Sequence, residues 1–110
     1  MKTLTKADIK RLNEIEEEDF VLINVLSKDA FNNKHICASI NIPFPENDNF
    51  VDDVAEVVGE NKDHKIIVYC ANKECDASPN AAKALEKAGF NHVYDYEGGM
   101  EDWESKKQAG

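Results

Sequence analysis

Hydrophobic residues recur along the chain with two different periods, and these periods alternate from one segment to the next. Continuous apolar runs predict buried strands at residues 20–26 and 65–70, and the second run is the most hydrophobic of the chain. Weaker patterns predict strands that end near residue 4 and lie at residues 39–43 and 91–96. Strands that alternate with helices predict an α/β fold with a parallel sheet and helices on both faces.

Helical spacing of apolar residues predicts a helix after each of these strands. Thr5 and Asp8 resemble a capping box, although Glu or Gln is its usual second member. Ser27 is expected to cap a short helix that reaches about residue 33, and Ser78 to cap a helix that begins at Pro79. The residues expected to share apolar helical faces are Ile9, Leu12 and Ile15; Phe50, Val51, Val54, Val57 and Val58; Ala81, Ala82, Leu85 and Ala88; and Met100 and Trp103.

Ligand sites in open parallel sheets lie beyond the carboxyl ends of the strands. The loops after residues 25, 43, 70 and 96 are therefore the places to look for a site. Gly98 and Gly99 predict a turn in the last of these loops.

Length and composition restrict the classes of protein to consider. The chain has 110 residues, of which 42% are hydrophobic, and this favours one domain over residues 1–110. Its apolar runs are too short to span a bilayer, and the first residues lack the apolar core of a secretory signal, so we expect a cytoplasmic protein without a membrane partner. A net charge of −9 with a single arginine, Arg11, disfavours nucleic acid as a partner.

Three cysteines, Cys37, Cys70 and Cys75, are too few and of the wrong parity for a secreted disulfide scaffold. In a reducing compartment such thiols are buried hydrophobes, metal ligands or catalytic groups. The three histidines are scattered, so a zinc site has little support, and we expect neither a metal nor a cofactor.

Cys70 is the last residue of the most hydrophobic predicted strand, and a loop and then a helix follow it. Backbone N–H groups of such a loop can converge on one point, and the helix N-terminus adds its positive end. A thiol at that point would have a lowered pKa, because the thiolate is the form that these groups stabilise. From position alone, however, a buried core thiol is an equally good interpretation of Cys70.

Several separated motifs resemble one family. Residues 66–103, which include IIVYC, AAKALEKAGF and EGGMEDW, look like the second half of a single-domain rhodanese, a family of sulfurtransferases. Residues 35–43, HICASINIP, are similar to the first signature of that family, which usually reads HIPGAINIP. The resemblance extends from residue 4 to about residue 107, and it implies a rhodanese-like fold with a central parallel sheet of about five strands.

The resemblance also implies a mechanism, because the family's nucleophilic cysteine aligns with Cys70. Its thiolate would take a sulfane sulfur from thiosulfate or from a small or protein-bound persulfide, and would then pass it to a thiol or to cyanide. The outer sulfur of the Cys70 persulfide would be held by the backbone N–H groups of Ala71, Asn72, Lys73, Glu74, Cys75 and Asp76.

The chain departs from the family at three places. Many relatives carry Asp-x-Arg after the second strand, where this chain has Asn24 and Leu26, and the loop after Cys70 is about two residues longer than the common form. This loop also has no arginine, and Asp76 stands where the related dual-specificity phosphatases would need one, so phosphatase activity is disfavoured. The acidity of the loop and of the chain favours a persulfide donor of low charge over the thiosulfate dianion.

The role of Cys75 stays open between three interpretations. It can be a resolving thiol that attacks the Cys70 persulfide, a second sulfur carrier, or a small residue that packs in the loop. Cys37 is expected to be a packed thiol, and His35 to be structural. A hydrogen bond from the Ser78 hydroxyl to the cradle is a less favoured alternative to capping.

The sequence therefore leaves three hypotheses. The first is a sulfurtransferase that acts through Cys70. The second is a thiol–disulfide or persulfide reductase that uses Cys70 and Cys75. The third is a rhodanese-fold binding module without catalytic activity.

Overall fold

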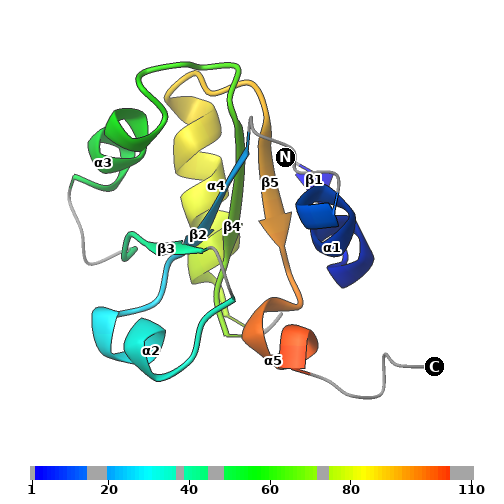
Figure 1. Ribbon diagram of the computed structural model, residues 1–110. Helices are drawn as coiled ribbons and strands as arrows, with labels where there is room; N and C mark the ends of the chain where they lie inside the picture. The colour runs from blue at the N-terminus through cyan, green and yellow to red at the C-terminus, as the bar shows by residue number, and fades with distance from the viewer. Residues whose placement is uncertain (1, 15–19, 37–38, 45–48, 72–74, 105–110) are drawn as a thin grey trace.

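The computed structural model of the chain describes residues 2–14, 20–36, 39–44, 49–71 and 75–104. Five parallel strands form one sheet in the order β1-β5-β4-β2-β3, which confirms the predicted α/β fold (Figure 1). The strands are β1 (Lys2–Thr3), β2 (Phe20–Asn24), β3 (Ile40–Asn41), β4 (Lys65–Tyr69) and β5 (Val93–Tyr96). The most hydrophobic predicted strand is thus the central one, β4.

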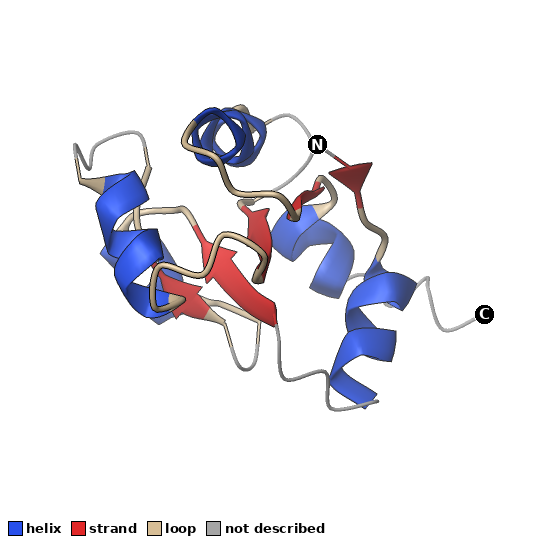
Figure 2. Ribbon diagram, turned by 90° about the horizontal axis from the view of Figure 1, so that it is seen from above, coloured by secondary structure: helices blue, strands red, loops and turns tan. Residues whose placement is uncertain are grey.

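Helices cover both faces of this sheet (Figure 2). They are α1 (Lys6–Glu14), α2 (Lys28–Asn33), α3 (Phe50–Val57), α4 (Ala77–Lys87) and α5 (Gly99–Glu104). Side chains of α3 and α4 contribute to the apolar cluster on one face, and side chains of α1 and α5 contribute to the cluster on the other. None of the helices in the described residues has both the length and the apolar character needed to cross a membrane.

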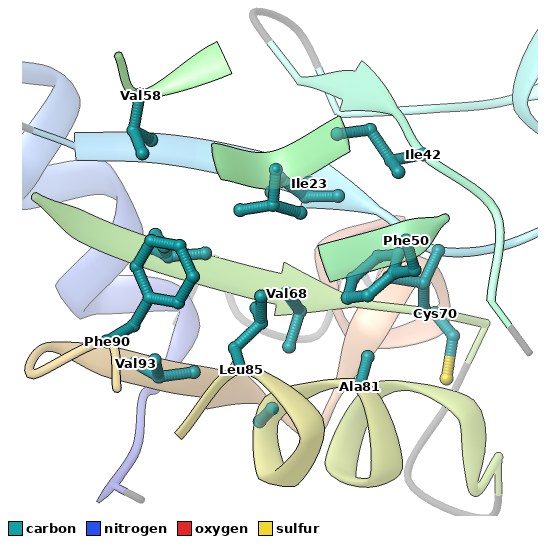
Figure 3. Close-up of a cluster of buried hydrophobic side chains, with 14 residues drawn as sticks. Ile23, Ile42, Phe50, Val58, Val68, Cys70, Ala81, Leu85, Phe90 and Val93 are labelled. Carbon is teal, nitrogen blue, oxygen red and sulfur yellow. The ribbon is translucent and has the colours of Figure 1, made fainter. Parts of the chain in front are cut away.

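The central strand β4 is buried on both faces, as its continuous apolar run predicts. Ile66 and Val68 lie in the cluster beneath α3 and α4, whereas Ile67 and Tyr69 lie in the cluster beneath α1 and α5. Figure 3 shows Val68 among the side chains of the first cluster, with Cys70 at its edge beside Ala81. Successive side chains of a strand point to opposite faces, so one short run supplies the core of both layers.

Two of the predicted helix caps are confirmed. The Asp8 N–H donates to Thr5 Oγ1 over 3.3 Å, and the Thr5 N–H donates to Asp8 Oδ2 over 3.0 Å. This reciprocal pair satisfies two backbone donors at the start of α1, and it lowers the pKa of the Asp8 carboxyl. At the start of α2, Ser27 Oγ accepts the Ala30 N–H.

Several predicted positions need correction. Val57 does not share the buried face of α3, because 49% of its surface is exposed, and Ala88 is exposed at the end of α4. Strand β2 ends at Asn24, not at residue 26, because the Asn24 side chain accepts the Leu26 N–H and turns the chain. The side chain of Leu12, together with Ile15, lies outside the described residues.

Candidate active site

Cys70 follows the last residue of β4 directly, at the carboxyl edge of the parallel sheet. Its side chain is 1% exposed and belongs to the apolar cluster that also contains Ala81 and Ala82 of α4. The sequence predicts this placement, apart from the end of the strand, which comes one residue earlier.

The start of the loop after Cys70 is held by helix α5. The Met100 N–H donates to the Cys70 carbonyl over 2.9 Å, and the Glu101 N–H donates to the Ala71 carbonyl over 2.8 Å. Gly99 permits this contact, because a side chain there would collide with the Cys70 carbonyl oxygen, and its φ of +60° lies in the left-handed region. The pair predicted as a turn therefore has a second role, which is to bring α5 against the candidate site.

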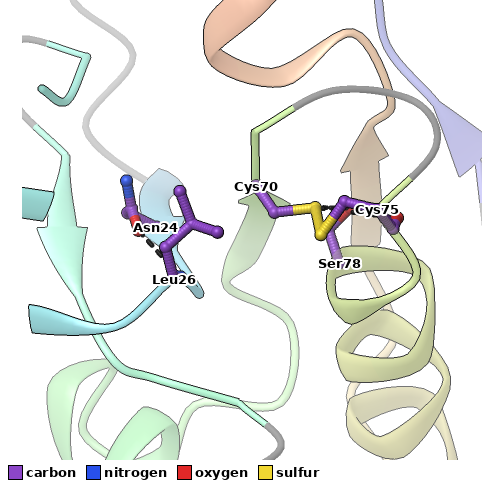
Figure 4. Close-up of a disulfide and its surroundings, with 5 residues drawn as sticks. All are labelled: Asn24, Leu26, Cys70, Cys75 and Ser78. Atoms are coloured by element: carbon purple, nitrogen blue, oxygen red, sulfur yellow. Dashed lines mark hydrogen bonds between the residues drawn. A yellow bond between two sulfur atoms is a disulfide. The ribbon is translucent and has the colours of Figure 1, made fainter. Parts of the chain in front are cut away.

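Cys75 is joined to Cys70 by a disulfide, with 6.5 Å between the two Cα atoms (Figure 4). The structure thus brings together the predicted nucleophile and the predicted second thiol. Cys75 is half-buried, whereas Asp76 is exposed and is the N-cap residue of α4. Asn72, Lys73 and Glu74, the middle of the predicted cradle, lie outside the described residues, as does Cys37.

The predicted start of the helix after the loop, with Ser78 as its cap, needs correction. Helix α4 begins at Ala77, so Ser78 lies in its first turn and is not the capping residue. Pro79 lies in the same turn, where it is tolerated because the first N–H groups of a helix have no partner within the helix. The Ser78 side chain is 1% exposed, and its Oγ lies 3.5 Å from Cys70 Sγ. With Cys70 in a disulfide, the hydroxyl is the donor of this contact, and its acceptor is the Cys70 sulfur and not a backbone group of the predicted cradle.

Asp95 is a buried acid near the candidate site that the sequence analysis missed. It lies in β5 beside Val68 of β4 and is 1% exposed, and neither of its carboxyl oxygens has a hydrogen-bond partner among the described residues. Burial raises the pKa of this carboxyl, the Ser78 hydroxyl opposes part of the rise, and the Glu97 carboxylate adds to it. In the disulfide form the Ser78 hydroxyl donates to Cys70 Sγ, and neither carboxyl oxygen of Asp95 accepts a hydrogen bond from it. The sequence offers one signal for Asp95, which is an acidic residue at a strand position that faces inward.

Asn24 stands where many relatives carry an acidic residue, and it takes part in a hydrogen-bond network of neutral groups. Its Nδ2 donates to the Tyr69 hydroxyl over 3.1 Å, and its Oδ1 accepts the Leu26 N–H over 2.9 Å. The same hydroxyl accepts the Ile36 N–H and lies 2.8 Å from Ser39 Oγ. Leu26 packs against the apolar cluster that contains Cys70, so this position offers no charge to the candidate site.

The remaining chemistry-bearing residues of the described part of the chain do not form a metal site. No group of three or more His, Cys, Asp or Glu side chains gathers within that part. The exposed His35 ring stacks on Phe31, with 4.0 Å between the ring centroids, and its Nδ1 lies 2.8 Å from the Phe31 carbonyl oxygen. These contacts fit the structural role that the sequence favours.

The geometry therefore places a cysteine between the central strand of a parallel sheet and the N-terminus of a helix. The family described as rhodanese-like domain matches residues 8–106. The uncharacterized protein YibN of Escherichia coli strain K12 is 33% identical over 107 residues, which cover 94% of this chain and 67% of YibN. The chain belongs to the rhodanese-like domain family, as the sequence motifs predict.

Two further proteins are similar to this chain, one in structure and one in sequence. The BH2092 protein of Bacillus halodurans has a solved structure that matches with a TM-score of 0.81 and 26% identity, covering 99% of this chain and 74% of that one. The thiosulfate sulfurtransferase GlpE of Pseudomonas syringae pv. syringae is 30% identical over 89 residues, which cover 81% of this chain and 76% of GlpE.

Proposed function

We propose that this protein is a sulfurtransferase that carries a sulfane sulfur on Cys70. The observation that carries the proposal is the position of Cys70, between the end of the central strand and the first turn of α4. The positive end of that helix and the Ser78 hydroxyl favour the thiolate, which is the nucleophilic form. Membership of the rhodanese-like family and the similarity to a thiosulfate sulfurtransferase support it.

The reaction proceeds in two half-reactions. The Cys70 thiolate attacks the outer sulfur of a persulfide R–S–SH, forms a Cys70 persulfide and expels R–S⁻; with thiosulfate, the leaving group is sulfite. A thiol or cyanide then attacks the outer sulfur of the Cys70 persulfide, and the Cys70 thiolate leaves. The expected kinetics are ping-pong, because the first product departs before the acceptor binds.

The charge of the protein favours a persulfide as donor. The net charge is −9, and Asp76 stands exposed at the start of α4, so a dianion is repelled at long range and near the site. A persulfide donor of low charge is repelled less than the thiosulfate dianion. We therefore expect a higher kcat/KM for a persulfide donor than for thiosulfate.

The Cys70–Cys75 disulfide favours a second candidate function, a persulfide reductase. The Cys75 thiolate attacks the inner sulfur of the Cys70 persulfide, a disulfide forms, and HS⁻ leaves. Two equivalents of an external thiol then return the protein to its dithiol form and are themselves oxidised to a disulfide. The reducing cytoplasm that the sequence analysis expects would supply these thiols.

Steady-state kinetics with a persulfide donor separates these functions from each other and from a binding module. Loss of sulfur transfer in Cys70→Ser, with transfer retained in Cys75→Ser and in the control Cys37→Ser, supports the sulfurtransferase. Sulfide release that requires both Cys70 and Cys75 supports the reductase. If no variant differs from wild type and no donor is consumed, both proposals fail and the binding module remains.

A further inference from the structure

Three buried polar groups from three different elements lie on one side of the sheet, near the carboxyl end of β4. Cys70 follows β4, Ser78 lies in the first turn of α4, and Asp95 lies in β5, and each is 1% exposed. The Ser78 hydroxyl lies 3.5 Å from Cys70 Sγ and donates to it, which leaves the Ser78 oxygen able to accept from a neutral acid. Ser78 is therefore placed to connect the sulfur to an acid on the same side of the sheet.

The sheet register explains why these groups share one side of the sheet. Asp95 pairs with Val68, which precedes Cys70 by two residues and points to the same face of the sheet. Val93, two residues before Asp95, lies in the apolar cluster beneath α4, so Asp95 also turns toward α4. The acid thus lies on the same side of the sheet as Cys70 and the buried face of α4.

The surroundings of Asp95 offer its charge no compensation among the described residues. The neighbouring buried side chains of β4 and α4 are apolar apart from Cys70 and Ser78; they are Ile66, Val68, Ala81, Ala82 and Leu85. Thr3 of β1, which pairs with Asp95, is uncharged, and Glu97 at the end of β5 carries the same charge as a carboxylate. A buried acid without a partner favours its neutral form, so Asp95 holds a proton that it can give up.

We propose that Asp95 is a positioning residue that exchanges a proton with the Cys70 sulfur through the Ser78 hydroxyl. The inference deepens the proposed function, because it rests on Cys70 being the reacting thiol. One hydroxyl supports two arrangements. In the first, the Cys70 thiol donates to Ser78 Oγ and the Ser78 hydroxyl donates to an Asp95 carboxylate. In the second, neutral Asp95 donates to Ser78 Oγ and the Ser78 hydroxyl donates to a Cys70 thiolate. Two concerted proton shifts convert one arrangement into the other, with no change in total charge.

The relay has a defined task when the disulfide opens. Cys75 is half-buried whereas Cys70 is 1% exposed, so an external thiolate attacks Cys75 Sγ and Cys70 leaves as a thiolate. Ser78 passes its proton to Cys70 Sγ and takes one from Asp95, which becomes a carboxylate. With dithiothreitol as the reductant, its second thiol then releases Cys75, and the reductant leaves as a cyclic disulfide.

The test measures the opening of the disulfide in purified oxidised protein by dithiothreitol, across a pH series. The rate is divided by the thiolate fraction of the reductant at each pH. In the wild type this corrected rate should fall as pH rises through the pKa of Asp95, because the proton donor is lost. In Asp95→Asn the rate should be lower by about tenfold or more at low pH, and the inflection should disappear. Asp102→Asn is the matched control. The Asp102 carboxyl accepts a hydrogen bond from the Tyr96 hydroxyl at 2.5 Å, and its replacement should leave the pH profile unchanged.

Ser78 variants separate a relay from damage to the fold. Ser78→Ala should slow the opening as much as Asp95→Asn does, and the double variant should be no slower than either, because both remove the same path. Ser78→Thr keeps the hydroxyl and should retain the wild-type profile.

An unchanged profile in Asp95→Asn, or losses that multiply in the double variant, would overturn the relay. None of these measurements uses a sulfur donor, so their outcome is independent of sulfur transfer. A protein that shows the expected profiles but transfers no sulfur would contradict the proposed function alone. A protein that transfers sulfur with a flat wild-type profile would contradict the relay alone.

Discussion

The backbone N–H of Met100 donates to the carbonyl of Cys70 over 2.9 Å, so the last helix holds the residue at which the candidate active loop begins. Gly99 allows this approach, since any side chain there would meet the Cys70 carbonyl oxygen. The EGGM segment, far from Cys70 in sequence, is thereby part of the support of the candidate site.

Gly99→Ala should therefore damage both stability and the site. We expect the free energy of unfolding to fall by about 3 kcal/mol, from left-handed backbone strain and the collision together. Gly89→Ala is the control, because Gly89 has a φ of +104° but no atom within 4 Å of an added Cβ. The control should lose only about 1–2 kcal/mol. Urea denaturation measures the free energy of unfolding of both variants. Equal losses would show that the collision with Cys70 adds nothing to the cost of the backbone strain.

Asn24→Asp, the substitution toward the family's acidic residue, should destabilise this protein. The carboxylate would lose the hydrogen bond that Nδ2 donates to the Tyr69 hydroxyl, at a buried position, and the expected cost is about 1–3 kcal/mol. The cost should grow as pH rises and the new carboxyl ionises. Asn80→Asp makes the same change at an exposed position in the first turn of α4, where negative charge is favourable, and should not destabilise. Equal stability of the two variants near neutral pH would refute the importance of the neutral network.

Asp95 should make the protein less stable as pH rises. Its pKa is raised in the folded state, so folding favours the protonated form, and the resulting stability is fully present below the unfolded-state pKa. It is lost as pH rises through the folded-state pKa. Asp95→Asn should remove this dependence and be more stable than wild type at neutral pH. Thermal unfolding between acidic and neutral pH measures the effect, with the exposed Asp52→Asn as control. If stability still decreases with rising pH in Asp95→Asn, the pH dependence belongs to another titrating group.

Much of the fold follows from local patterns. The run that forms β4 is long and apolar enough to mark a strand buried on both faces, and Thr5 and Ser27 mark helix starts through side chains that satisfy backbone donors. The family motifs add the placement of Cys70 between strand and helix. These features depend on neighbours in sequence, which is why sequence reasoning finds them.

The rest depends on contacts between distant segments. Ser78 has a residue type that suits a cap, and only the packing of α4 against β4 shows that its hydroxyl faces Cys70. The alternation within β5 marks Asp95 as facing inward, but its place on the same side of the sheet as Cys70 follows from the register of β5 beside β4, which no local pattern encodes. Val57 is 49% exposed at the last position of α3, although its spacing from Phe50 and Val54 suits the buried face of the helix.

The most direct test of the account is the mass of the reduced protein after it meets a low-molecular-weight persulfide, followed by peptide mapping. The account predicts a gain of one sulfur atom on Cys70 in Cys75→Ser, and none in Cys70→Ser. In the wild type, the sulfur should either stay on Cys70 or be replaced by the Cys70–Cys75 disulfide with release of sulfide. A sulfur found on Cys75 or Cys37 in the Cys70→Ser variant, at the wild-type rate, would contradict the assignment of Cys70 as the carrier.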